Sequence, residues 1–200
     1  MFTNNFSSVT IGWVAIATGI AGLLGLAFII LFFTVGQPFG TLNDICIGLT
    51  AILSVVLVWM LYPEHHAQSP LLSQVALVIA MFGAILVMVG SALAISGVKG
   101  WFLSGLYMAA GNAMIGLWLL GLNYSSLRGN PLSHSLVILG LISGVILALG
   151  LVTIPGIFRG IDTQEYELSI FNYIWWASSL GWLVLYPIWC ILLGRIILLK

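Results

Sequence analysis

The sequence predicts an all-α integral membrane protein, a helical bundle with six transmembrane helices in a single membrane domain. Hydrophobic residues make up 62% of the 200 residues and charged residues only 5%, too few to cover a water-soluble domain. The apolar runs are continuous and long enough to cross a hydrocarbon core of about 30 Å, which takes about 20 helical residues. A transmembrane barrel would instead alternate polar and apolar residues over about ten positions.

Six apolar runs are the predicted spans. They cover approximately residues 11–35, 42–63, 70–96, 101–123, 132–157 and 168–194. The first run has no basic residue before it and no small-residue cleavage signal, which favours a retained membrane helix over a signal peptide. Pro187 predicts a kink or the end of regular helix in the sixth run, because its ring removes an amide hydrogen bond.

Basic residues in the short loops predict that both termini are cytoplasmic. In that orientation Arg128, Arg195 and Lys200 lie inside, whereas Lys99 and Arg159 lie outside. This excess of three over two follows the positive-inside rule, by which cytoplasmic loops carry more Lys and Arg.

Composition and cysteine spacing exclude several partners and cofactors. The net charge is zero, with 5 basic and 5 acidic residues, and no basic stripe for nucleic acid is present. Cys46 and Cys190 lie inside apolar runs and predict neither a disulfide framework nor a zinc site. We expect no cofactor. The expected partners are membrane lipids, with other membrane subunits or a second copy of the chain as further possibilities.

An internal period predicts three tandem helical hairpins, approximately residues 8–68, 69–129 and 130–200. Residues that recur at spacings of 61 or 62 are Ser8, Ser69 and Asn130; Gly22, Gly83 and Gly144; Pro70 and Pro131; and Tyr62, Tyr124 and Tyr186. Ser or Asn before Pro is typical of an N-cap followed by the first helical residue. We expect each repeated tyrosine to close an even-numbered helix at the cytoplasmic interface.

The repeated glycines predict close helix packing. Gly22, Gly83 and Gly144 each fall about four turns into an odd-numbered helix, near mid-membrane. There the missing side chain lets a neighbouring helix approach, and Gly140 with Gly144 completes a GxxxG pattern.

Asn43 and Asp44 allow two interpretations. Setting the even-numbered helices at about 100° per residue puts Asn43 near the face of Asn112, and Asp44 within about 40° of Asn172. These four residues would form a polar strip towards the external side, as a small-molecule or ion carrier would need. The favoured alternative is Thr41 as N-cap with Asp44 at the third helical position, where the helix dipole stabilises an acid.

Three histidines are weak candidates for metal ligands. His65, His66 and His134 fall on the same predicted side of the membrane, as ligands of a metal or a haem would. Adjacent helical residues point about 100° apart, and no His-x-x-x-His or His-Glu-x-x-His spacing is present. A hydrated loop with titratable imidazoles is therefore the favoured interpretation.

Tryptophans are concentrated in the sixth run, at positions 175, 176, 182 and 189. We interpret them as aromatic girdles at the two membrane interfaces. No Walker sequence, Gly-x-Ser-x-Gly elbow or metalloprotease motif is present, which argues against an enzyme.

Two stretches resemble a family of bacterial membrane proteins. Residues 31–44, LFFTVGQPFGTLND, and 185–195, LYPIWCILLGR, are similar to six-helix bacterial proteins of unknown function. The resemblance spans most of the chain and implies a bacterial inner-membrane location, with no known activity to carry over. Our leading hypothesis is a non-catalytic accessory, lipid-binding or interaction module. A carrier using the polar strip is the alternative, and a metal or redox enzyme built on the histidines ranks third.

Overall fold

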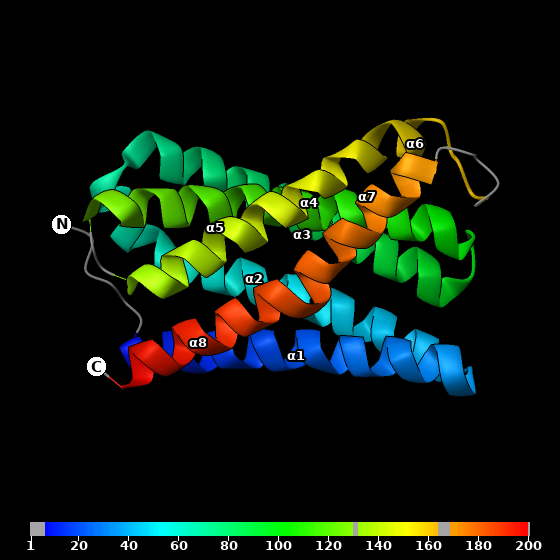
Figure 1. Ribbon diagram of the computed structural model, residues 1–200, viewed down its shortest axis with the longest axis horizontal. Coiled ribbons are helices and arrows are strands. Elements are labelled where there is room, and N and C mark those ends of the chain that lie inside the picture. Colours follow the sequence, from blue (N-terminus) through cyan, green and yellow to red (C-terminus); the bar gives the residue numbers. More distant parts are fainter. Residues whose placement is uncertain (1–6, 130–131, 164–168, 200) are drawn as a thin grey trace.

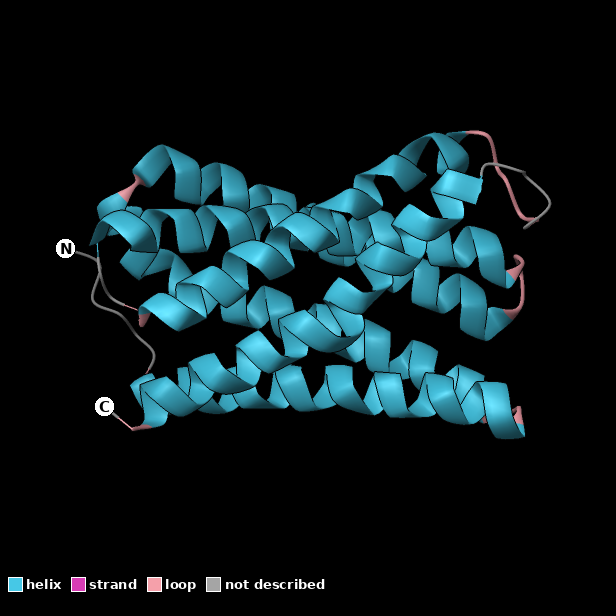
Figure 2. Ribbon diagram, in the orientation of Figure 1, coloured by secondary structure: helices cyan, strands magenta, loops and turns pink. Residues whose placement is uncertain are grey.

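Helices make up every regular element of the described chain. A computed structural model describes residues 7–129, 132–163 and 169–199. Six of its helical spans are long and apolar enough to cross a membrane, which confirms the predicted fold class (Figure 2). In chain order the elements are α1 (Ser8–Val35), α2 (Phe39–Gln68), α3 (Pro70–Ser96), α4 (Trp101–Gly129), α5 (His134–Ala148), the 3-10 helix η1 (Leu149–Thr153), α6 (Ile154–Phe158), α7 (Ser169–Leu180), the π-helix η2 (Gly181–Leu185) and α8 (Tyr186–Leu198).

Helix starts agree with the sequence where a capping residue stands directly before the apolar run. Ser7 is the N-cap of α1, and its hydroxyl accepts the backbone N–H of Thr10 at 3.1 Å. Ser69 and Pro70 begin α3 as predicted, because proline suits a first helical position that needs no amide donor. The α5 start differs, since Ser133 is its N-cap. Asn130 and Pro131, the predicted start, lie outside the described residues.

The start of α2 contradicts the capping interpretation of Asp44. The helix begins at Phe39, so Thr41 already lies in its first turn. The side-chain oxygen of Gln37 accepts the Thr41 backbone N–H at 3.4 Å, which satisfies a donor that the helix leaves free. Asp44 falls in the second turn, beyond the reach of the free amides at the helix start. Thr41 is therefore not the N-cap, and Asp44 does not cap α2.

Two spans are interrupted next to a proline. In the sixth span the π-helix η2 directly precedes Tyr186 and Pro187, and the Tyr186 N–H bonds to the Gly181 carbonyl. In the fifth span the 3-10 helix η1 precedes Pro155 in α6. Proline lacks an amide hydrogen and crowds the turn before it, so the backbone adopts another helical spacing there. The interruption predicted from Pro187 is confirmed.

The spans pack in chain order, and the sixth returns to the first. Each helix from α1 to α4 contacts the next, while α8 lies against α1 (Figure 1). The span of α4 is the most buried of the six. The start of α1 and the end of α8 lie at one end of the bundle, which we call the terminal end (Figure 1). α2 and α4 also end there, and α3 and α5 begin there.

Glycines allow three of the helix pairs to approach closely. A Cβ added to Gly83 would lie 2.5 Å from the carbonyl oxygen of Gly111 in α4. A Cβ on Gly22 would lie 2.5 Å from the ring of Pro187 in α8, and one on Gly144 would lie 2.9 Å from the Gly116 carbonyl oxygen in α4. Gly83 thus faces the following span, whereas Gly144 faces the preceding one. The three glycines do not occupy equivalent contacts, so the hairpin repeat remains a prediction from sequence.

Aromatic rings fill the middle of the bundle. Trp182, Tyr186 and Trp189 stack along the sixth span with centroid separations of 5.4 and 6.3 Å, and all three are buried. Trp118 of α4 meets Trp189 edge-on at 6.3 Å. The girdle interpretation is wrong for Trp182 and Trp189, and Tyr186 does not lie at an interface. Trp118 of α4 and Ser54 of α2, which contact Trp189 and Tyr186, come from other spans, and the sequence of one helix does not reveal them.

Candidate functional site

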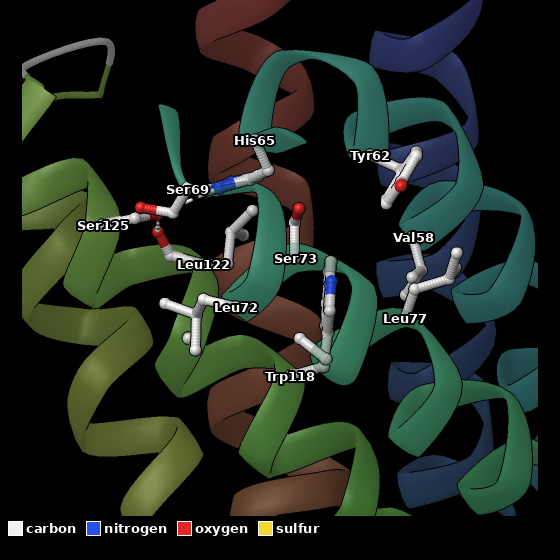
Figure 3. A pocket seen from close by; sticks show the side chains of 12 residues that line it. Val58, Tyr62, His65, Ser69, Leu72, Ser73, Leu77, Trp118, Leu122 and Ser125 are labelled. Carbon is white, nitrogen blue, oxygen red and sulfur yellow. Dashed lines mark hydrogen bonds between the residues drawn. The ribbon is translucent and has the colours of Figure 1, made fainter. Parts of the chain in front are cut away.

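A pocket lies between α2, α3 and α4 at the terminal end of the bundle. Its volume is about 10 Å³, room for about one group the size of a water molecule. Polar side chains gather at one end, and the Trp118 indole lies at the other (Figure 3). The polar lining residues are Tyr62, His65, Ser69, Ser73 and Ser125. The remaining lining residues are apolar or glycine, with Leu72 and Leu77 contributed by α3.

His65 is held by a residue from another span. Its Nδ1 lies 2.9 Å from the Ser125 hydroxyl of α4, and the same hydroxyl donates to the Leu122 carbonyl at 2.9 Å. The two partners are 60 residues apart, so only the packing of α2 against α4 brings them together. This pair fixes the imidazole in the wall of the pocket.

His66 belongs to a second group beside the pocket. Its Nδ1 lies 3.0 Å from the Tyr62 hydroxyl, one helical turn earlier, and 3.4 Å from the Ser73 hydroxyl of α3. Ser73 also donates to the Pro70 carbonyl at 3.0 Å. The group therefore ties the end of α2 to the start of α3.

The structure does not bring the three candidate metal ligands together. His65 and His66 bond to different partners, and His134 is exposed at the start of α5. Within the described ranges, no three His, Cys, Asp or Glu side chains are close enough to hold a metal ion. A position on the same side of the membrane was too weak a criterion, because His65 and His66 face different neighbours and His134 belongs to another helix.

At the far end of the bundle, Asn43 and Asp44 lie next to each other on α2. The Asn43 amide donates to the Asp44 carboxylate at 3.3 Å. The Asn43 side chain is buried, and its oxygen faces Gly25 of α1 without a hydrogen-bond partner among the described residues. Asp44 is half-buried. The pair combines a carboxylate with a buried amide oxygen.

Helix register separates Asn43 from Asn112 in depth. Ser91 of α3 lies against Gly48 of α2, and its neighbour at position 90 lies against Ser104 of α4. Asn43 precedes Gly48 by five residues towards the far end, whereas Asn112 follows Ser104 by eight towards the terminal end. At 1.5 Å per residue the two asparagines are about 20 Å apart along the bundle. They cannot contact one small ligand together.

Asn172 lies in α7, and its side chain is outside the described part of the structure.

Asn123, which the sequence did not single out, is fully buried on α4, and its amide donates to the Leu119 carbonyl at 2.8 Å. A Cβ on Gly140 of α5 would overlap the Asn123 amide. Gly140 thus makes room for a buried polar side chain.

Asp162 is a further structural residue that the sequence did not identify. Its carboxylate accepts the backbone N–H groups of Gly100 at 2.7 Å and Leu103 at 3.1 Å, and so caps the start of α4. The acid comes from the loop after α6, so no local capping pattern reveals it. This contact ties that loop to the α3–α4 turn.

No protein family, curated protein or solved structure matches the chain. The resemblance to six-helix bacterial membrane proteins therefore gains no support. Two polar sites bear on function, the pocket at the terminal end and the Asn43–Asp44 pair at the far end.

Proposed function

We propose that this protein is a non-catalytic membrane module that binds a lipid in the pocket at the terminal end. The observation that carries the proposal is the division of the pocket into a polar end, with His65, Ser69 and Ser125, and an apolar remainder. An amphiphile has the same division. The positive-inside margin supports a cytoplasmic terminal end, and we propose the bacterial inner membrane as its location.

The depth of the pocket supports a lipid ligand. The second span ends at Ala67 and the third begins at Pro70, so the polar lining residues lie near the ends of the spans. Lipid headgroups lie at this level of a membrane. Leu72 at the pocket shares one face of α3 with Val75 and Phe82, and all three are exposed. An acyl chain can follow this face while the terminal group of the headgroup enters the pocket.

Retention of lipid during purification tests this function. Leu72→Trp places a large ring at the pocket, whereas Leu71→Trp changes a neighbouring residue that is 76% exposed and does not line the pocket. Native mass spectrometry should find one phospholipid bound to the wild type and to Leu71→Trp, but not to Leu72→Trp. Equal retention by both tryptophan variants, or no bound lipid in any of them, would reject the proposal.

A second candidate function is ion transport through Asn43 and Asp44. The buried, unpartnered amide oxygen beside a carboxylate favours a cation, because both groups supply oxygen ligands. Sodium uptake into proteoliposomes by the wild type but not by Asp44→Asn would support this candidate. Uptake that is absent, or equal in both proteins, would exclude a carrier built on Asp44.

A further inference from the structure

The hydrogen bonds around His65 define which polar atom of its ring is free. The Ser125 hydroxyl has a single proton, and it donates to the Leu122 carbonyl. The Ser125 hydroxyl makes both of its bonds at once only when His65 Nδ1 carries the proton of their 2.9 Å bond. In the neutral imidazole this leaves Nε2 as a hydrogen-bond acceptor. The histidine thus offers the pocket a lone pair and selects a ligand that donates.

Aromatic rings elsewhere in the lining of the pocket favour a cationic donor. Trp118 and Tyr62 both line the pocket, and the faces of indole and phenol rings attract cations. Among the described side chains that line the pocket there is no Lys or Arg, the residues that usually bind phosphate. An acceptor nitrogen and two rings suit an ammonium group better than an anion.

The size of the pocket restricts the kind of ammonium. Its volume of about 10 Å³ admits about one group the size of a water molecule. A primary ammonium is of that size, whereas a trimethylammonium carries three additional methyl groups. The pocket therefore discriminates between headgroups that end in a primary amine and those that end in choline.

We propose that the pocket binds the terminal primary ammonium of a phospholipid headgroup, with ethanolamine as the simplest example. The ammonium donates a hydrogen bond to His65 Nε2 and lies near the rings of Trp118 and Tyr62. Ser125 acts as a positioning residue, because it holds the His65 tautomer that presents the acceptor. This inference rests on the proposed lipid-binding function and adds the headgroup class.

Headgroup selectivity of ligand-induced stabilisation tests the inference. Short-chain phosphatidylethanolamine, phosphatidylcholine and phosphatidylglycerol with identical acyl chains are titrated against the detergent-solubilised protein, and the melting temperature is followed. The ethanolamine lipid should bind about tenfold more tightly than either of the others, as expected for one desolvated cation–π contact and a hydrogen bond. Free ethanolamine at the same concentrations should produce a much smaller shift.

Variants of one side chain separate the role of His65 from general destabilisation. His65→Phe keeps a ring but removes the acceptor and should abolish the preference, whereas His65→Gln keeps an acceptor and should retain part of it. His134→Phe, an exposed histidine at the same end of the bundle, is the control and should behave as the wild type. The melting temperature without lipid shows whether each variant is folded.

The outcomes distinguish the inference from the function on which it rests. Equal affinity for all three lipids, lost in Leu72→Trp, would overturn the ammonium assignment and leave lipid binding intact. A preference for ethanolamine lipid that survives in folded His65→Phe would also overturn the assignment. Free ethanolamine as effective as the lipid would reject the lipid as its source, and no binding of any lipid would reject both proposals.

Discussion

Replacing Gly83 with alanine tests whether close glycine packing holds α3 against α4. The added Cβ would lie 2.5 Å from the Gly111 carbonyl oxygen and 2.7 Å from Met114 Cβ, whereas ordinary contact begins at 3.4 Å. Neither neighbour is the flexible end of a side chain. To restore ordinary contact with the Gly111 oxygen, the helices must move apart by about 0.9 Å, from 2.5 to 3.4 Å. Overpacking of this kind typically costs about 1–3 kcal/mol.

Gly121→Ala is the matched control for this substitution. Gly121 lies in the adjacent helix α4, and a Cβ there would meet nothing closer than 3.7 Å. The helix propensity of alanine exceeds that of glycine by up to about 1 kcal/mol, and this gain applies equally to both variants. Their difference in stability therefore isolates the packing term, which we expect to be about 1–3 kcal/mol.

This difference in stability is measured by unfolding the protein in a mild detergent to which a denaturing detergent is added in increasing fractions. Gly83→Ala should unfold at a lower fraction of denaturing detergent than the wild type, and Gly121→Ala at an equal or higher fraction. If Gly83→Ala proves as stable as Gly121→Ala, Gly83 does not hold α3 against α4, and the reasoning from backbone approach fails.

Three further predictions concern the remaining architecture. Asp162→Ala should destabilise the protein by about 1–2 kcal/mol in thermal unfolding, because the Gly100 and Leu103 amides lose a charged acceptor; an unchanged melting temperature would contradict the cap. Tyr186→Phe should cost about 1 kcal/mol in the same assay, because the tyrosine hydroxyl donates to buried Ser54 at 2.8 Å. Single cysteines at positions 7 and 199 should be labelled from the same side of the membrane, and labelling from opposite sides would contradict six crossings.

Sequence alone predicted the number, type and approximate limits of the spans. Continuous apolar runs and start signals such as Ser69–Pro70 are local, and the third span agrees with its predicted limits of 70–96. The start of α2 was placed too late because Thr41 and Asp44 imitate a local cap, whereas the side chain of Gln37 performs that role. Local patterns can identify a helix without identifying the group that satisfies its ends.

The candidate sites depended on contacts between spans, and these contacts cannot be predicted from local sequence patterns. Rotation about a helix axis placed Asn43 and Asn112 on similar faces, but it did not fix their depth, and packing separates them by about 20 Å. His65 was identified, yet its partner Ser125 lies 60 residues away and carries no motif. Asp162 could not be identified as a cap from the sequence, because its target amides belong to another turn.

An experimental density map of the protein in nanodiscs of phosphatidylethanolamine tests the central claim most directly, since it shows what occupies the pocket at the terminal end. We predict density for a headgroup whose terminal nitrogen lies within hydrogen-bonding distance of His65 Nε2, with an acyl chain along the α3 face of Leu72 and Phe82. A pocket filled by protein side chains, or density confined to an isolated water with no lipid beside α3, would contradict lipid binding at this site.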